Sequence, residues 1–198
     1  MNTVKPLGVI LCGGQSARMG VDKCEIDYHG KPQKEHLKSL LNPFCRGIVV
    51  STGNTEVKEE DCFSDLPEYK DHGPISGLLS LFHFFPDRDL LVVGGDYPLL
   101  QTSTLLYLLS SETNSPILAF QTKESKQAEP LIALYRKEAY PLLLEAFRQG
   151  EDSLRRIIKS LDIPLIEAPE YFSLMSADRP EDSLRVREII RSGKLTFA

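Results

Sequence analysis

Residues Leu7 to Lys23 read LGVILCGGQSARMGVDK, an apolar run followed by a polar loop rich in glycine. The run Leu7 to Leu11 has no polar side chain, which is typical of a strand buried on both faces of a parallel sheet. The glycines of the loop let the backbone turn tightly and approach a ligand. Its N–H groups, with Arg18 and Lys23, favour a phosphate-rich ligand. We therefore predict that this loop binds the phosphates of a nucleoside triphosphate.

Two better-known phosphate-binding loops do not fit this stretch. A P-loop requires G-x-x-x-x-G-K-[ST], whereas Gly20 is followed by Val21. A dinucleotide fingerprint requires G-x-G-x-x-G at the start of a helix, and the stretch does not contain it. The remaining alternative is a plain turn with two exposed cations, which the combination of Gly14, Ser16, Arg18 and Lys23 disfavours.

Size and charge restrict the class of protein. The chain has 198 residues, 41% hydrophobic and 26% charged, which suits one globular domain over residues 1–198. The net charge of −5 gives no general attraction to nucleic acid or to a membrane surface. Phosphate binding would therefore need a local group of cations or a metal ion.

Cysteine usage and hydropathy indicate a reducing compartment. Cys12, Cys24, Cys45 and Cys62 form no C-x-x-C pair, so we expect four free thiols. The apolar run at the N-terminus is too short for a signal peptide, and no stretch approaches the roughly 18 apolar residues of a membrane span. We expect a cytoplasmic protein.

Short apolar runs alternate with amphipathic segments along the chain. This predicts an α/β fold: a single Rossmann-like three-layer domain with a mostly parallel twisted sheet and helices on both faces. In such folds ligands bind at the carboxyl ends of the strands. The expected strands are residues 7–11, 47–51, 90–93, 117–121, 131–135 and, as short strands, 165–168 and 171–174; the expected helices are residues 33–41, 75–85, 103–109, 138–149, 153–161 and 181–192.

The glycine-rich stretch resembles the signature of the molybdenum cofactor guanylyltransferases, L-A-G-G-x-S-x-R-M-G-x-D-K, within the nucleotidyltransferase superfamily. The similarity continues in order along most of the chain. It includes the following motifs: Gly30-Lys31-Pro32, Gly73-Pro74-Ile75-Ser76-Gly77-Leu78, Gly95-Asp96-Tyr97-Pro98, Glu129-Pro130-Leu131, Ser153-Leu154-Arg155-Arg156 and Arg179-Pro180-Glu181-Asp182.

The resemblance implies transfer of GMP from GTP to the terminal phosphate of molybdopterin, with release of pyrophosphate. It implies that Asp96 binds Mg²⁺ and that Arg18 and Lys23 steady the triphosphate, so that Arg18, Lys23 and Asp96 are the catalytic residues. The acceptor is already an anion, so no strong general base is needed. Contacts with proteins of molybdenum cofactor synthesis would be transient.

The nucleotide-binding residues implied by the resemblance are Leu11, Cys12, Gly13, Gly14, Ser16, Lys23, Ser51, Asp65, Asp71, Gly77 and Asp96. Asp65 and Asp71 compete for one nucleotide contact, and the spacing to Gly73 favours Asp65. Gly14 favours guanine as the base of the nucleotide, because relatives that use cytosine tend to have L-A-A-G at these positions.

The chain departs from the family pattern near the C-terminus, before Asp96, and at Gln33 and Lys34, where the family usually has apolar residues. The family often shows N-x-N-T-P-E-D near the C-terminus, whereas Ser176 and Asp178 replace both asparagines. Asp178 is a second candidate metal ligand, or an acidic residue favourable at a helix N-terminus. Gly95 replaces a more usual Cys before Asp96. Two other functions remain open: a related nucleotidyltransferase that uses CTP or activates a sugar or alcohol phosphate, and a non-catalytic nucleotide-binding regulator.

Overall fold

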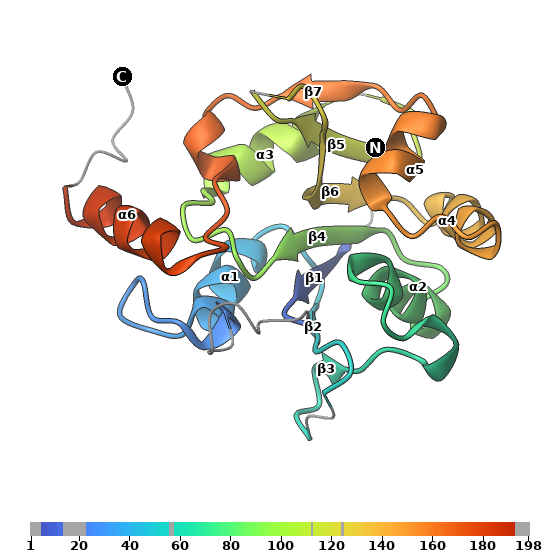
Figure 1. Cartoon of the computed structure of the whole chain (residues 1–198), viewed down its shortest axis with the longest axis horizontal. Coiled ribbons are helices and arrows are strands. Elements are labelled where there is room, and N and C mark those ends of the chain that lie inside the picture. Colours follow the sequence, from blue (N-terminus) through green and yellow to red (C-terminus); the bar gives the residue numbers. More distant parts are fainter. Residues whose placement is uncertain (1–4, 14–22, 56–57, 112, 124, 193–198) are drawn as a thin grey trace.

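The strands of the computed structural model, which describes residues 5–13, 23–55, 58–111, 113–123 and 125–192, form one twisted sheet (Figure 1). Among these residues the sheet has seven strands in the order β3-β2-β1-β4-β6-β5-β7. β6 runs antiparallel to β4 and β5, and every other neighbouring pair is parallel. The strands are β1 (Leu7–Leu11), β2 (Ile48–Ser51), β3 (Cys62–Phe63), β4 (Leu90–Gly94), β5 (Ile117–Gln121), β6 (Ala128–Tyr135) and β7 (Leu165–Glu167).

Helices cover both faces of this sheet. Those described are α1 (Gln33–Leu41), α2 (Pro74–Phe84), α3 (Thr102–Ser110), α4 (Ala139–Arg148), α5 (Leu154–Ser160) and α6 (Pro180–Arg191). Figure 1 shows α1 and α3 on one side of the strands, with α2, α4 and α5 on the other. The mostly parallel α/β sheet covered on both faces, predicted from the sequence, is confirmed.

Alternating side chains of the central strands divide the core into two layers. Val9 and Val92 pack with the helices α2, α4 and α5, whereas Ile10 and Val93 pack with α1 and α3. All four side chains are fully buried. The continuous apolar runs in the sequence therefore arise because successive side chains of a strand point to opposite faces and both faces are covered.

The C-terminal helix α6 packs away from the sheet, in a smaller apolar cluster. This cluster joins Val186 of α6 to Tyr28, Leu99 and Ala177. The Tyr28 hydroxyl also lies 2.6 Å from the Ser183 hydroxyl of α6. These contacts tie α6 to the segment after the glycine-rich loop and to the loop after β4.

Some local predictions were wrong. Residues 171–174 form a 3₁₀ helix rather than a strand. β6 begins at Ala128, three residues before the expected strand. α3 begins at Thr102, one residue before the expected helix. Within the described part of the chain, no helix has the length and apolar character needed to cross a membrane.

Helix α2 approaches the sheet closely at Gly77. A Cβ atom at this position would lie 2.6 Å from the Ser51 Oγ of β2 and 3.1 Å from the Leu11 Cδ2 of β1. Both Gly77 and Ser51 are buried. The absence of a side chain at Gly77 therefore sets the distance between α2 and the carboxyl ends of β1 and β2.

We expect Gly77→Ala to lower the free energy of unfolding by about 1–3 kcal/mol, because overpacking outweighs the gain in helix propensity. Urea denaturation measures the loss. Adding Ser51→Ala removes the hydroxyl that the new methyl meets, so the double variant should recover part of it. Equal stability of Gly77→Ala and the unaltered chain would contradict this packing explanation.

Candidate active site

The predicted site residues that the structure describes gather at the carboxyl edge of the sheet. Cys12 follows β1, Ser51 ends β2, and Asp96 lies two residues after β4. The Cys12 and Gly13 amides both donate to the Ser51 carbonyl oxygen, at 2.8 and 3.0 Å. The Gly95 amide donates to the Leu11 carbonyl oxygen at 3.0 Å. Three loops are therefore held together at one place by backbone hydrogen bonds.

Gly13 packs directly against the loop that follows β2. A Cβ atom at Gly13 would lie 2.2 Å from the Gly53 nitrogen and 2.3 Å from its Cα atom. Backbone atoms cannot move aside as the end of a flexible side chain can, so a side chain at position 13 would force the two loops apart. This contact is a structural reason for the first glycine of the glycine-rich loop.

Lys23 joins two carboxylates that are far apart in the sequence. Its Nζ atom lies 2.6 Å from Asp178 Oδ1 and 3.5 Å from Asp96 Oδ2. The Asp96 carbonyl oxygen accepts from the Ala177 amide at 2.8 Å, which anchors the segment of Asp178 beside the loop after β4. The Ser176 hydroxyl donates to Asp178 Oδ2 at 2.8 Å. We call Lys23, Asp96 and Asp178 the charge cluster.

The environment perturbs the ionisation of each member of the charge cluster. Burial raises the pKa of the Asp96 carboxyl, and the neighbouring Asp178 adds to this, against the opposing effect of Lys23. Burial alone would raise the pKa of Asp178, but hydrogen bonds from Lys23 and Ser176 outweigh it and lower that pKa. Desolvation opposes the charge of Lys23, yet the two carboxylates outweigh it and raise the Lys23 pKa.

The structure distinguishes Asp65 from Asp71. Asp65 is only 8% exposed, and its Oδ1 atom has no hydrogen-bond partner among the described residues. Burial raises its pKa to about 6, against the opposing charge of Lys70. Asp71 is exposed, has a positive φ of 68°, and accepts a 2.6 Å hydrogen bond from Asn54. A buried carboxylate without a partner lowers stability, which favours a functional reason for Asp65.

The other predicted residues divide into two groups. Leu11, Ser51 and Gly77 lie together where α2 meets the ends of β1 and β2. Gly14, Ser16 and Arg18 lie outside the described residues, so their predicted roles stay predictions. The described residues lie at the carboxyl edge of the sheet, as expected from the sequence. Their individual roles in the site remain predictions.

The expectation of four free thiols was wrong. Cys12 and Cys24 form a disulfide, with their Cα atoms 5.7 Å apart, whereas Cys45 and Cys62 remain thiols. The two partners stand twelve residues apart and flank the glycine-rich loop. Their spacing matches no disulfide or metal motif, so the pair could not be predicted from the sequence. The two cysteines meet because the segment after the glycine-rich loop packs against the end of β1.

A polar network beside Asp96 was not predicted from the sequence. Glu129 of β6 is 3% exposed and pairs with Arg155 of α5 at 3.3 Å. The buried Tyr97 hydroxyl donates to the same carboxylate, and burial together with Glu129 raises the Tyr97 pKa. Both charged residues occur in the motifs of the family resemblance, but those motifs assign them no role. The network places a half-exposed guanidinium on the β6 side of the charge cluster.

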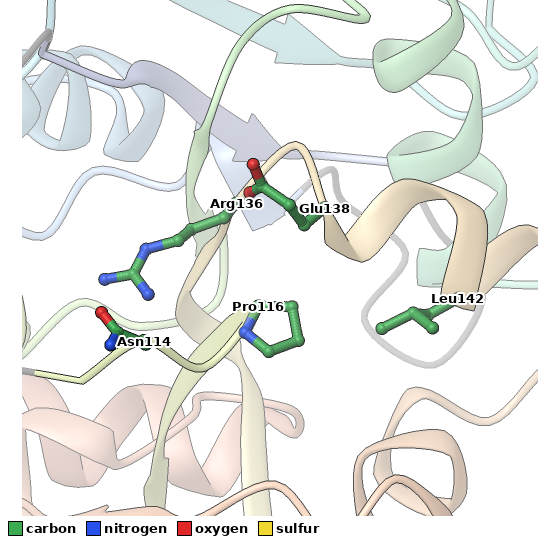
Figure 2. A pocket seen from close by; sticks show the side chains of 5 residues that line it. All are labelled: Asn114, Pro116, Arg136, Glu138 and Leu142. Atoms are coloured by element: carbon green, nitrogen blue, oxygen red, sulfur yellow. The ribbon is translucent and has the colours of Figure 1, made fainter.

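A pocket and a group of acidic residues lie outside this site. A pocket of about 420 Å³ is lined by Asn114, Pro116, Arg136, Glu138 and Leu142, at the start of β5 and the end of β6 (Figure 2). That is the opposite edge of the sheet from Asp96. Glu59, Asp61 and Cys62 form a group that resembles a metal site, but Lys34 and Lys38 pair with its two carboxylates.

Asp65→Asn should change stability in a pH-dependent way. The folded-state pKa of about 6 lies above the ordinary 3.8, so the folded state holds this proton more tightly and stability falls as the pH rises between these values. At pH 8 we expect the variant to be more stable by at most about 3 kcal/mol, with little difference below pH 4. Urea denaturation at both pH values tests this. Asp71→Asn is the control, and equal gains in the two variants would contradict the assignment.

The chain is similar in sequence to proteins of molybdenum cofactor synthesis. A molybdenum cofactor guanylyltransferase of Xanthomonas euvesicatoria is 32% identical over 182 residues, covering 90% of this chain and 93% of that protein. A "Probable molybdenum cofactor guanylyltransferase" of Pyrococcus horikoshii is 32% identical over 190 residues, covering 90% and 97%. A molybdenum cofactor biosynthesis bifunctional protein of Synechocystis is 26% identical over 181 residues, and the alignment spans only 52% of its length.

Solved structures agree in fold. The molybdopterin-guanine dinucleotide biosynthesis protein A of Archaeoglobus fulgidus superposes with a TM-score of 0.74 at 22% identity, covering 94% of this chain and 99% of that one. The 2-C-methyl-D-erythritol 4-phosphate cytidylyltransferase of Thermus thermophilus gives 0.67 at 12% identity, covering 94% and 99%. The model of the MobA-like NTP transferase domain matches residues 8–165, so this chain is a nucleotidyltransferase that belongs to the MobA-like NTP transferase domain family.

Proposed function

We propose that the protein transfers GMP from GTP to molybdopterin, with release of pyrophosphate, at the charge cluster. The observation that carries the proposal is the meeting of Lys23 with Asp96 and Asp178, beside the loop that resembles a triphosphate-binding signature. The names of the relatives in Xanthomonas and Pyrococcus support the choice of donor and acceptor. The proposal assigns this activity to one domain that spans the chain.

The charge cluster fits a divalent cation. Asp96 and Asp178 are close enough for their carboxyl groups to share a hydrogen bond, and a cation, the Lys23 ammonium, already contacts both. Mg²⁺ prefers oxygen ligands and usually takes one or two carboxylates together with phosphates and waters. Asp96 and Asp178 would hold it, and the bound ion would offset the charge that two anionic substrates bring together.

The residues of the chain would mainly position charges. Lys23 would leave Asp178 and pair with phosphate oxygens of the nucleotide, and Arg18 would steady the pyrophosphate that leaves. A phosphate oxygen of the acceptor would bond to the α-phosphorus as the bond from that phosphorus to the pyrophosphate breaks. Because this oxygen is already anionic, no side chain needs to take its proton. Positioning and charge neutralisation are the main means of catalysis in such transfers.

Asp65 and Arg155 would serve opposite sides of the site. Asp65 would accept a hydrogen bond from the nucleotide, which would give its unpartnered Oδ1 atom a donor. Arg155, held by Glu129 next to Tyr97, would attract an anionic group of the acceptor. We also propose that the protein acts in the cytoplasm and contacts other proteins of molybdenum cofactor synthesis transiently.

Binding of GTP with Mg²⁺ should be tight in the unaltered chain and at least tenfold weaker in Lys23→Ala, because loss of a charged hydrogen bond costs about 1.5–3 kcal/mol. Calorimetry measures both affinities. Lys5→Ala is the control, since Lys5 contacts the Pro43 carbonyl oxygen at the opposite edge of the sheet.

The same titration with CTP separates the alternatives. GTP much tighter than CTP supports the guanylyltransferase, whereas CTP equal or tighter would point to a nucleotidyltransferase that activates another phosphate. Binding of GTP without any turnover of molybdopterin would point to a nucleotide-binding regulator. Binding of neither nucleotide would contradict the proposal.

Metal dependence tests the two carboxylates separately. We expect Asp96→Asn to abolish turnover, because Asp96 is the more buried of the two carboxylates, with 17% of its side chain exposed against 55% for Asp178, so water can least replace it as a ligand. Asp178→Asn introduces the amide that related sequences carry, so turnover should persist but need more Mg²⁺. Rates over a Mg²⁺ titration measure both effects. Normal turnover of Asp96→Asn at the ordinary Mg²⁺ concentration would overturn its assignment.

A further inference from the structure

We propose that Cys12 and Cys24 form a redox-modification site that reacts with disulfide oxidants and dithiol reductants, and that closing the bond lowers nucleotide affinity. The second part rests on the proposed function, whereas the first part does not. The glycine-rich loop, residues 13–23, lies between the two cysteines. A covalent bond between them joins the two ends of that loop.

The disulfide is built into the active-site edge. Cys12 directly follows β1, and Cys24 lies in the 3₁₀ helix Lys23–Glu25. Their Cα atoms are 5.7 Å apart, within the usual range for a disulfide. The Cys12 amide donates to the Ser51 carbonyl oxygen of β2 at 2.8 Å, so the Cys12 end is fixed to the sheet. Closing the bond therefore attaches the Lys23 segment to the sheet as well.

Gly95 makes room for the sulfur atoms. A Cβ atom at position 95 would lie 2.3 Å from Cys24 Sγ and 3.7 Å from Cys12 Sγ. Gly95 also precedes Asp96 of the charge cluster and donates its amide to Leu11. Any side chain here, including the Cys more usual in related sequences, would displace Cys24. The pair and the glycine therefore fit one another at a position that touches the site.

The two sulfur atoms differ in access. Cys24 is 1% exposed, whereas Cys12 is partly exposed, so an incoming thiolate would attack Cys12 Sγ. Opening the bond gives two thiols on the protein and converts the attacking dithiol to a disulfide. Closing it consumes one disulfide oxidant, such as oxidised glutathione, and releases two thiols. In a reducing compartment, disulfides that do form are usually catalytic or redox-sensing.

The position of Lys23 connects this chemistry to the site. Lys23 adjoins Cys24, and with the bond closed its Nζ atom lies on Asp178 and Asp96. A closed bond limits how far this segment can follow a bound triphosphate, and an open bond releases it. If oxidation weakens GTP binding by some factor, GTP must favour the reduced form by the same factor.

The test uses the full chain, first reduced with dithiothreitol and then treated with oxidised glutathione. Intact-mass and peptide measurements follow the loss of two hydrogen atoms and the Cys12–Cys24 linkage. Calorimetry with GTP and Mg²⁺ then compares the two forms. We expect reversible formation of the linkage and a GTP Kd several-fold higher in the oxidised form. Cys24→Ala should abolish the loss of two hydrogen atoms on treatment with the oxidant, and Cys62→Ser, which keeps the pair, should retain it.

Each outcome has a definite meaning. Failure of the linkage to form, or formation that a dithiol does not reverse, overturns the redox site whatever GTP does. A reversible linkage with equal GTP affinity in both forms overturns the control of binding. If neither form binds GTP but the linkage is reversible, the redox site stands and the proposed function fails. A loss of two hydrogen atoms that persists in Cys24→Ala would assign the new disulfide to another pair of thiols and overturn the proposal.

Discussion

The parallel pairing of β1 with β2 on one side and β4 on the other is the constraint on which the site depends. Parallel neighbours end at the same edge, so the loops after Leu11, Ser51 and Gly94 must converge. Backbone hydrogen bonds between these loops and close contact at Gly13 and Gly77 hold the convergence at short range. Three parts of the sequence thereby meet at one edge of the sheet.

At this edge of the sheet the site gathers buried and partly buried charged groups, which are rare in the rest of a folded protein. Burial and the neighbouring Asp178 raise the pKa of Asp96, hydrogen bonds from Lys23 and Ser176 lower the pKa of Asp178, and Lys23 contacts both carboxylates. The buried Oδ1 atom of Asp65 has no hydrogen-bond partner among the described residues. Closely spaced or buried carboxylates of this kind reduce the stability of the fold. In proteins they occur at functional sites, where a bound ligand pairs with them. The Cys12–Cys24 pair would also restrain the position of Lys23, because Lys23 is bonded through the backbone to Cys24.

The sequence predicted the sheet and the edge at which the site lies, because apolar runs and strand–helix alternation are local signals. It missed contacts that depend on which distant segments meet. The partnership of Lys23 with Asp178 spans 155 positions, and that of Glu129 with Arg155 needs the β6 register beside α5. The Cys12–Cys24 disulfide has no motif spacing. Residues 171–174 were expected to form a short strand, yet they form a 3₁₀ helix in which Ser173 and Leu174 are buried.

The most direct test of the central claim is a crystal structure of the unaltered protein with GTP and Mg²⁺. The charge cluster predicts that the 2.6 Å contact between Lys23 Nζ and Asp178 Oδ1 opens. Lys23 should then contact a phosphate oxygen, with the metal ion bound by Asp96. Nucleotide bound at this edge with the Lys23–Asp178 contact intact and no metal on Asp96, or nucleotide bound at another part of the molecule, would contradict the account.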